Sequence, residues 1–311
     1  MIHIEQIRKS YNGTRGLDSF SLRIGAGELC GLVGPNGAGK TTLIKILATL
    51  LPPDGGQATV AGIDVTQNRA AIKALVGYMP DQPGLYQDMR VKEFLEFFAD
   101  AFRISGARRS DAVDHGLQRS GLAERSAAFV EELSFGMKQR LLLAKTLLHE
   151  PKVLLLDEPA TGLDPLARID LRQRLRELSN QGLTILVSSH ILADLEEICD
   201  RVALISEGRN AVDASGQSVL EMQPAKPQAA MYEIEVLGEI QPAVAVVGSI
   251  AGVRVLQSEG QALLVEIAGG PSNAAALLRA VVGSGLDVVR FERPSLTLEQ
   301  RYRQIFGGGR Q

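Results

Sequence analysis

The sequence lacks the features of a membrane-spanning, secreted or nucleic-acid-binding protein. No apolar run approaches the roughly 18 residues of a transmembrane helix, and the segment beginning at Met1 has no signal-peptide core. The two cysteines, Cys30 and Cys199, lie far apart in apolar contexts, which predicts buried free thiols in a reducing cytosol. A formal net charge of −3 provides no field that attracts nucleic acid or an anionic membrane, so no nucleic-acid partner is expected.

The composition is that of a folded globular protein. Of the 311 residues, 45% are hydrophobic and 22% are charged, and this length predicts about two domains that can each bury a core. A polar, proline-bearing stretch at 221–229 is typical of a linker. We therefore expect one domain at 1–220, the linker at 221–229 and a second domain at 230–311.

A glycine-rich segment carries the strongest functional signal. It fits the pattern G-x-x-x-x-G-K-[ST], in which backbone N–H groups surround phosphates. The apolar run 29–33 before it predicts a buried strand, and residues 40–50 after it predict a helix whose positive end favours anions. The predicted nucleoside triphosphate site consists of Gly34, Pro35, Asn36, Gly37, Ala38, Gly39, Lys40, Thr41 and Thr42. Lys40 is expected to reach the β- and γ-phosphates, and the Thr41 hydroxyl is expected to bind Mg²⁺.

The rest of the first 220 residues has an α/β pattern. Residues 2–8 and 18–24 alternate apolar and polar residues, as strands of a half-exposed antiparallel sheet do. Apolar residues recur with helical spacing over 91–102, which predicts an amphipathic helix. Further strands are expected at 58–63, 75–79, 152–157, 183–188 and 201–206, and further helices at 109–120, after Ser134 and at 166–180.

A pair of carboxylates follows one of these strands. The run Lys152–Asp157 is typical of a buried parallel strand that delivers Asp157 to its carboxyl edge, where ligands of α/β sheets bind. Glu158 comes next, and His190 follows the strand expected at 183–188. Ser134 is the natural N-cap of the helix that follows it.

The segment 230–311 has a different pattern and no visible chemistry. Strands expected at 232–236, 253–257, 262–267 and 286–291, with helices at 242–250 and 272–284, give the order βαββαβ of a ferredoxin-like α+β domain. A terminal helix is expected at 297–306. The segment contains no histidine, cysteine or glycine-rich phosphate loop.

Residues 1 to about 220 resemble the ATP-binding subunits of ABC transporters, because six separately placed motifs occur in that family's order. The resemblance implies a P-loop core with an antiparallel β-subdomain and a helical insertion at about 86–140. More weakly, the end of the chain, Arg293-Pro-Ser-Leu-Thr297, resembles the C-terminal extension of one branch of the family, whose partners are separate membrane proteins and often exporters.

The resemblance also implies roles for individual residues. Asp157 would support Mg²⁺, Glu158 would act as general base toward water, and His190 would hydrogen-bond the γ-phosphate. Tyr11 stands where the family stacks adenine; from the sequence alone, a solvated tyrosine in the polar turn Lys9–Gly13 is the alternative.

Further roles lie across a dimer. In the family two domains meet head to tail, so that ATP lies between the P-loop of one and the signature motif of the other. Ser134 and Gly136 stand in that motif, and Asp164 stands in the loop that communicates across the dimer.

The sequence departs from the family at two positions. The usual glutamine after the strand that ends at Met79 is replaced by Asp81, and Gln82 follows; either Asp81 takes the metal-facing role, or the loop shifts by one residue and Gln82 takes it. Phe135 replaces the first glycine of the signature, where a Cβ-bearing residue resists backbone angles that glycine adopts. Either the loop relaxes into ordinary angles, which moves the Ser134 and Gly136 amides off the phosphate, or the ring packs on the neighbouring protomer; we expect the first.

The combined interpretation is an ATPase subunit that binds ATP and Mg²⁺, forms a homodimer or heterodimer and drives a separate membrane permease, as part of an exporter. Its expected location is the cytoplasmic face of the cell membrane. Two alternatives are a soluble ABC-type ATPase that takes no part in transport and an ATP-gated scaffold that hardly hydrolyses.

Overall fold

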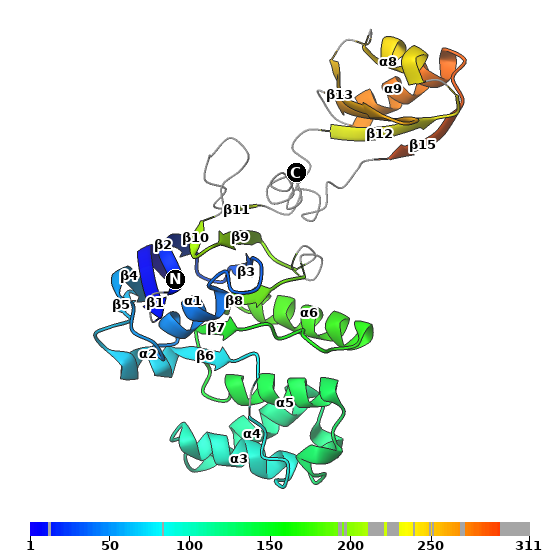
Figure 1. The fold of residues 1–311 in the computed structure, drawn as a ribbon. Coiled ribbons are helices and arrows are strands. Elements are labelled where there is room, and N and C mark those ends of the chain that lie inside the picture. The colour runs from blue at the N-terminus through cyan, green and yellow to red at the C-terminus, as the bar shows by residue number, and fades with distance from the viewer. Residues whose placement is uncertain are drawn as a thin grey trace. The chain divides into compact units, whose positions relative to one another are not determined.

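The computed structural model describes residues 1–11, 14–82, 84–191, 195, 198–210, 221–222, 230–238, 240–248, 250, 252–267 and 271–292. The chain forms two compact units, one of Met1–Pro224 with Leu298–Gln311 and one of Ala225–Thr297. Each unit is described by itself (Figure 1).

An antiparallel sheet stands at the start of the first unit. Its strands β1 (Ile2–Tyr11), β2 (Thr14–Ile24), β4 (Gly55–Val60) and β5 (Ile63–Asp64) lie in the order β2-β1-β4-β5. The predicted alternation of β1 and β2 is confirmed, because Ile2, Ile4 and Phe20 are buried. Both strands are longer than expected, and Tyr11 is the last residue of β1 and lies in no turn.

The second sheet of this unit is mostly parallel. Its strands β3 (Leu29–Val33), β6 (Val76–Met79), β7 (Val153–Leu156), β8 (Thr184–Ser189), β9 (Arg201–Ser206) and β10 (Arg209–Asn210) lie in the order β10-β9-β3-β8-β7-β6. Strands β3 and β7 are buried along their whole length, as strands covered on both faces are. Glu221 and Met222, which were expected in the linker, instead form strand β11 against β9.

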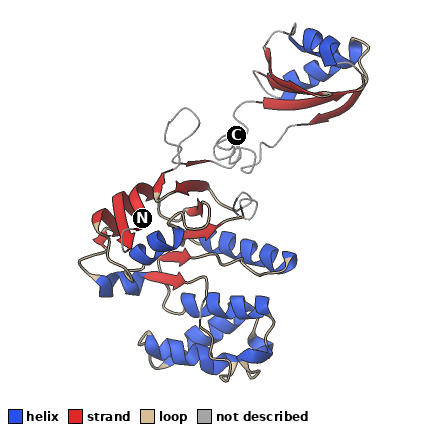
Figure 2. Cartoon of the chain, viewed as in Figure 1, coloured by secondary structure: helices blue, strands red, loops and turns tan. Residues whose placement is uncertain are grey.

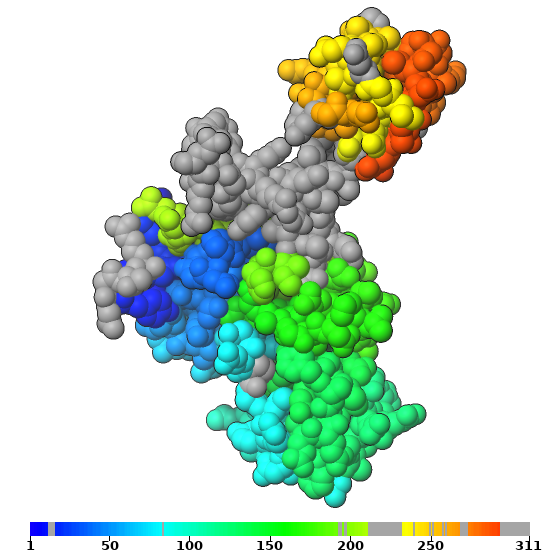
Figure 3. Space-filling view, turned by 45° about the vertical axis from the view of Figure 1, so that its right-hand side comes forward, coloured from blue at the N-terminus to red at the C-terminus, as the bar shows by residue number. Residues whose placement is uncertain are grey.

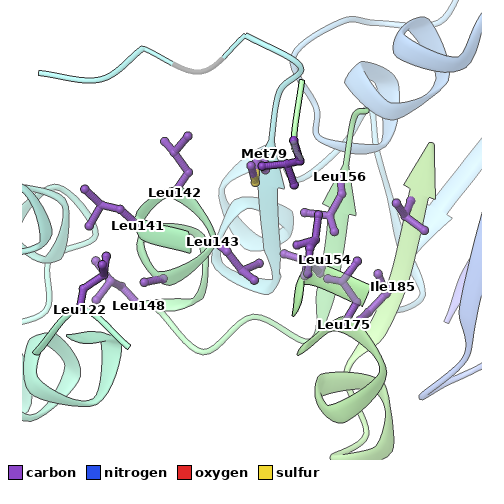
Figure 4. Close-up of a cluster of buried hydrophobic side chains, with 14 of the residues drawn as sticks. Met79, Leu122, Leu141, Leu142, Leu143, Leu148, Leu154, Leu156, Leu175 and Ile185 are labelled. Atoms are coloured by element: carbon purple, nitrogen blue, oxygen red, sulfur yellow. The ribbon is translucent and has the colours of Figure 1, made fainter. Parts of the chain in front are cut away.

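Helices cover both faces of this sheet. Helix α1 (Lys40–Leu47) packs into one hydrophobic core, while α5 (Phe135–Leu147) and α6 (Pro165–Asn180) contribute to the other. Figure 4 shows Leu143 on the side of α5 that faces Leu154, and Leu148 on the side that faces Leu122. The sheet therefore separates two cores. One short helix, α2 (Arg69–Leu75), was not predicted.

The predicted helical insertion is present. It contains α3 (Val91–Ala101), α4 (Ala107–Ser120), the 3-10 turns Ala123–Arg125 and Val130–Glu132, and the beginning of α5. The helices form a bundle beside the sheet (Figure 2), and the space-filling view shows their surface in cyan to green as the lower part of this unit (Figure 3). Buried Phe94 and Leu95 confirm the apolar face predicted for 91–102.

The described residues of the second unit form one four-stranded antiparallel sheet and two helices. In chain order these are β12 (Ala230–Val236), α8 (Ile240–Gly248), β13 (Val253–Glu259), β14 (Ala262–Ile267), α9 (Pro271–Gly283) and β15 (Val288–Glu292). The sheet order is β13-β14-β12-β15, with apolar residues of both helices packed on it. The helix expected at 297–306 lies outside the described residues. Among the described helices, none combines the length and apolar content needed to cross a bilayer.

Candidate nucleotide site

The glycine-rich loop connects β3 to α1, as predicted. Two of its glycines are required by their surroundings. A Cβ on Gly34 would lie 2.1 Å from the carbonyl oxygen of Ile205, and a Cβ on Gly39 would lie 2.4 Å from that of Gly16. Gly39 also has φ +109°, which L side chains rarely adopt. The loop is therefore fixed against β9 and the end of the β1–β2 hairpin before any ligand binds.

A cavity of about 530 Å³ lies over this loop. It brings together residues that are remote in the sequence and that were predicted separately. Its lining consists of Tyr11, Gly16, Asn36, Gly37, Ala38, Gly39, Lys40, Thr41, Thr42, Asp81, Gln82, Glu158, Thr161 and His190. Of the predicted P-loop residues, only Gly34 and Pro35 are outside the lining.

Lys40 is buried and turned back onto its own loop. Its Nζ donates to the carbonyl oxygens of Gly34 at 2.7 Å and Pro35 at 3.2 Å, and it lies 3.3 Å from Glu158 Oε1. A buried ammonium needs such partners, because desolvation is costly without them. These contacts hold the only lysine of the cavity lining over the phosphate-binding loop.

Asp157 and Glu158 follow β7, and Ser188 of β8 joins them. Ser188 Oγ donates to Asp157 Oδ1 at 2.7 Å and accepts from the backbone N–H of Glu158 at 3.0 Å. Glu158 has φ +50°, an uncommon conformation that costs about 1–3 kcal/mol and occurs preferentially at functional sites. Ser188 thus fixes the side chain of the first acid and the backbone of the second.

The electrostatic environment of Asp157 is unfavourable to its charge. Burial raises the pKa of the Asp157 carboxyl above its usual value, the hydroxyls of Ser188 and Thr41 oppose this effect, and the nearby Asp81 and Glu158 carboxylates add to it. On the neighbouring strand, burial together with Asp157 and Asp81 raises the pKa of Tyr78 to about 12. Negative charge therefore accumulates around Asp157, and the Lys40 ammonium lies against the neighbouring carboxylate, 3.3 Å from Glu158 Oε1.

The Glu158 carboxylate also accepts hydrogen bonds from two further residues, His190 and Thr161. His190 Nδ1 lies 2.7 Å from Glu158 Oε2, so the ring N–H donates to the carboxylate, and the backbone N–H of His190 donates to the same oxygen at 3.3 Å. Thr161 Oγ1 donates to Oε2 at 3.4 Å. The carboxylate is therefore oriented by three groups on the cavity side.

Tyr11 lines the same cavity. Its side chain is 43% exposed, and its hydroxyl lies 3.4 Å from Thr42 Oγ1. A Cβ on Gly16 would lie 2.8 Å from Tyr11 Cε2, so Gly16 leaves the space that the ring occupies. This placement is compatible with a base stacking on the ring.

Asp81 and Gln82 both line the cavity, so the structure brings both candidates for the family's glutamine to the site. Both side chains are exposed. Asp81 Oδ1 accepts from the backbone N–H of Gln82 at 2.9 Å, which joins the two candidates in one local turn.

The residues present fit a Mg²⁺ ion. Asp157 Oδ2 is buried and accepts no hydrogen bond of normal geometry, and oxygen is the ligand type that Mg²⁺ prefers. The Thr41 hydroxyl lies close enough to lower the pKa of the same carboxyl. No group of three or more His, Cys, Asp or Glu side chains among the described residues could hold a metal. A metal here would thus need oxygens from the nucleotide and water as well.

Ser134, Gly136 and Asp164 lie outside this cavity. Ser134 caps α5 by accepting from the N–H of Met137 at 3.3 Å, and Asp164 caps α6 by accepting from that of Ala167 at 2.9 Å. A Cβ on Gly136 would lie 3.1 Å from the Cβ of Ala167, so the two helix starts pack closely. The predicted N-cap role of Ser134 is confirmed.

Phe135 is the first residue of α5, and its φ is not positive. The expectation that residue 135 adopts ordinary backbone angles is confirmed, because the residue lies within the helix. The side chain is 52% exposed, and its Cε1 lies 3.2 Å from where a Cβ of Gly162 would stand.

Sequence reasoning missed three residues of the site: Ser188, Thr161 and Gly16. Ser188 stands beside Ser189 and His190, and the expected carboxyl end of that strand was the available signal. Nothing in the sequence marks Thr161, which follows β7, or Gly16, which lies in β2, as a residue of the site.

The fold and the cavity define a P-loop nucleotide-binding ATPase. The sequence pattern of the ABC transporter family matches residues 17–161. The Escherichia coli protein named probable multidrug ABC transporter ATP-binding protein YbhF is 47% identical over 185 residues, which are 60% of this chain and 32% of that protein. This chain thus spans about a third of the length of that relative.

Two further comparisons cover more of their counterparts. The daunorubicin resistance ATP-binding protein DrrA3 of Streptomyces coeruleorubidus is 32% identical over 99% of this chain and 96% of that protein. A solved structure of the ATP-binding subunit of an ABC transporter is 30% identical, with a TM-score of 0.62, over 72% of this chain and 90% of that chain. The chain belongs to the ABC transporter family, as an ATP-binding protein.

Proposed function

We propose that this chain is the ATP-hydrolysing subunit of an ABC transporter and that it drives a separate membrane permease. The observation that carries the proposal is the single cavity that gathers the P-loop, Lys40, the Asp157–Glu158 pair and His190. Each of these groups has a role in phosphoryl transfer to water, and none of them depends on the second unit of the chain.

ATP would bind with its phosphates on the loop 34–42 and its base on Tyr11. Lys40 would exchange its contacts with the carbonyl oxygens of Gly34 and Pro35 for phosphate oxygens. Thr41 and Asp157 would hold Mg²⁺, which neutralises charge on the β- and γ-phosphate oxygens when bound. Asp81 or Gln82 would complete this side of the site.

Glu158 would act as the general base. Its carboxylate is oriented by His190 and Thr161, so it can accept a proton from a water that attacks the γ-phosphorus. The bond between γ-phosphorus and the bridging oxygen breaks, and ADP and inorganic phosphate leave. His190 would position both Glu158 and the γ-phosphate.

The working unit would be a dimer, with a second copy or a related chain. Ser134, Gly136 and Asp164 lie at exposed or half-buried helix starts and have no share in the cavity of their own chain. Two chains in head-to-tail contact would bring these groups to the partner's ATP and enclose two nucleotides. An N-capped helix start is a suitable anion site there.

The membrane partner is proposed to be a permease of an exporter. The support comes from relatives whose names refer to multidrug transport and daunorubicin resistance. The chain would lie at the cytoplasmic face of the membrane, attached through its partner. The transported substrate would be recognised by that partner.

The domain organisation is also a proposal. We assign residues 1–222, including strand β11, to the ATP-binding domain, with its helical insertion at about 86–140. Residues 223–229 are assigned to a linker and residues 230–311 to an accessory domain. The order βαββαβ and the sheet order β13-β14-β12-β15 support a ferredoxin-like fold for the accessory domain.

A matched pair of measurements tests the function. The wild-type chain should bind ATP by calorimetry and release phosphate only with Mg²⁺, and Lys40→Ala should lose nucleotide binding. Lys73→Ala, on the short helix α2, is the control and should bind as wild type does. A polytopic membrane protein should co-purify with the tagged chain. Nucleotide binding by Lys40→Ala at wild-type affinity would refute the site, and absence of a membrane partner would refute the transport role.

A further inference from the structure

A second cavity, of about 160 Å³, lies in the same unit and shares no lining residue with the nucleotide cavity. Its walls come from α4 and α5 on one side and from α6 on the other. Three arginines line it, Arg119, Arg140 and Arg174, together with apolar side chains such as Leu143 and Leu178. Its volume is small against the about 300–1,000 Å³ of sites for drug-sized ligands.

Two of the arginines converge on one point. A Cβ on Gly121 would lie 3.3 Å from Arg140 Nη1 and 3.9 Å from Arg174 Nη2. Arg174 is paired with Asp170 at 2.8 Å and also donates to the carbonyl oxygen of Arg119. Arg140 is half-buried and has no carboxylate within 4.0 Å among the described residues. Both guanidinium groups therefore border the space beside Gly121, where an anion would meet donors from both.

The one acid in the lining does not neutralise this group. Glu177 is exposed, and its Oε1 accepts from Gln173 Nε2 at 3.2 Å. The cavity therefore offers guanidinium donors, which suit the planar oxygens of a carboxylate.

The remaining lining is apolar. Leu143 and Ala144 are buried, and Leu147 and Leu178 are half-buried beside them. Water in such a space has few partners, whereas a short hydrocarbon group would remove apolar surface from water. The cavity combines an anion-binding rim with an apolar floor.

We propose that this cavity binds a small organic carboxylate with a short apolar body. The carboxylate would lie between Arg140 and Arg174, with Arg119 nearby, and the hydrocarbon would contact Leu147 and Leu178. The ligand would thereby contact both the helical insertion and α6.

If the proposed function holds, a ligand at this position should affect ATP turnover. Helix α5 begins after Ser134 and α6 begins after Asp164, the two caps assigned to the dimer contact. A molecule held between the bodies of these helices would fix their spacing and so the relative position of the two caps. Binding should then slow ATP turnover without competing with ATP.

The test is calorimetry on the full chain without nucleotide, with hexanoate as the probe. Acetate tests the carboxylate without the longer hydrocarbon chain, and 1-hexanol tests the apolar body alone. Hexanoate should bind measurably more tightly than either. Arg140→Gln should weaken hexanoate binding at least about tenfold, as expected for the loss of a charged hydrogen bond. Arg119→Gln, on an exposed position of α4, should weaken it less and guards against misfolding of the first variant.

Arg108→Gln is the matched control, because Arg108 is an exposed arginine of α4 outside the cavity. It should bind hexanoate as wild type does. Equal affinity for acetate and hexanoate, or wild-type binding by Arg140→Gln and Arg119→Gln, would overturn the proposed ligand class. Hexanoate should also lower phosphate release by wild type and not by Arg140→Gln. Binding without this inhibition would overturn only the regulation, whereas absent phosphate release from every variant would refute the proposed ATPase.

Discussion

Two regions of this chain each lie at the N-terminal end of a helix: the P-loop region, residues 34–42, and the signature region, residues 134–136. They differ in how many groups of a nucleotide site each one brings together within a single chain. Helix α1 begins at Lys40 beneath a cavity that already contains an oriented carboxylate and a histidine. Helix α5 begins after Ser134, which has a side-chain cap but no share in that cavity. One anion site is assembled within the chain, and the other is exposed.

This difference indicates which steps the isolated chain can perform. Binding of the phosphates needs only the first region, because the loop is fixed by its contacts with Ile205 and Gly16. Efficient hydrolysis would need the second region of another chain, since Ser134 and Asp164 are outside the cavity of their own chain. The two regions can therefore be tested separately.

The largest effect on the rate of hydrolysis is expected from a substitution in the cavity over the P-loop region. Glu158→Gln should keep ATP binding and slow phosphate release by about 10²–10⁴-fold, the usual range for loss of a general base. The amide keeps the size of the side chain but accepts a proton poorly. Steady-state phosphate release with saturating Mg²⁺ and ATP measures the effect.

Glu124→Gln, at an exposed position of the helical insertion, is the control for a lost carboxylate and should hydrolyse ATP as wild type does. If Glu158→Gln and wild type hydrolyse at the same rate, the base lies elsewhere in the cavity.

A substitution in the signature region should affect hydrolysis of the ATP that is bound by the partner chain. Ser134→Asp keeps an N-capping side chain but places a carboxylate where the γ-phosphate would approach. Hydrolysis should fall by about tenfold to a hundredfold through like-charge repulsion. Ser134→Asn, an equally good cap without charge, should stay within a few-fold of wild type.

Combining two variant chains tests whether the P-loop region of one chain works with the signature region of another. Lys40→Ala and Ser134→Asp would each impair both sites of the proposed homodimer, but a mixed dimer would contain one intact site. Phosphate release should therefore rise when the two impaired proteins are combined. No recovery, with mixed dimers detected by differential tags, would argue against a site shared between two copies.

The sequence was most informative where one local motif or one sheet rule determines the geometry. The loop 34–42 was predicted from its pattern, and Asp157 and His190 were expected at carboxyl ends of strands that are neighbours in a parallel sheet. Helix α2 was missed because its seven residues bury only Ile72, which gives no helical periodicity. Ser188 was missed because its role depends on the register of β7 with β8, which no local pattern specifies.

A smaller effect is expected on stability, again from the first region. Asp157→Asn should raise the melting temperature of the nucleotide-free protein at neutral pH, because it removes a buried charge that burial disfavours. The gain should lie in the about 0.5–2 kcal/mol typical of stabilising substitutions. Hydrolysis should fall at the same time, because the proposed carboxylate ligand of Mg²⁺ is lost.

The pH dependence has a definite sign. The folded protein raises the pKa of Asp157 above the ordinary value of 3.8, so it binds that proton more tightly than the unfolded chain does. The stability contributed by this group is present below pH 3.8 and is lost as pH rises through the raised pKa. The advantage of Asp157→Asn should therefore grow with pH over this window and then stay constant. An advantage that is independent of pH from 3.8 upward, seen in thermal melts, would exclude charge burial as its cause.

The smallest effect concerns Phe135, where the two regions of the proposed dimer would meet. Because residue 135 already has ordinary helical angles, a glycine there gains no special conformation, and the ring is the only feature to remove. The ring is half-exposed over Gly162 and beside Ser134, so it hinders the approach of a partner's phosphate. Phe135→Ala and Phe135→Gly should both raise phosphate release by about two- to fivefold, which is roughly 0.4–1 kcal/mol of activation free energy. Both should also favour the ATP-bound dimer, measured by light scattering with Glu158→Gln added. A gain with glycine alone would show that backbone freedom matters after all, and a loss with both would make the ring a contact that stabilises the closed dimer.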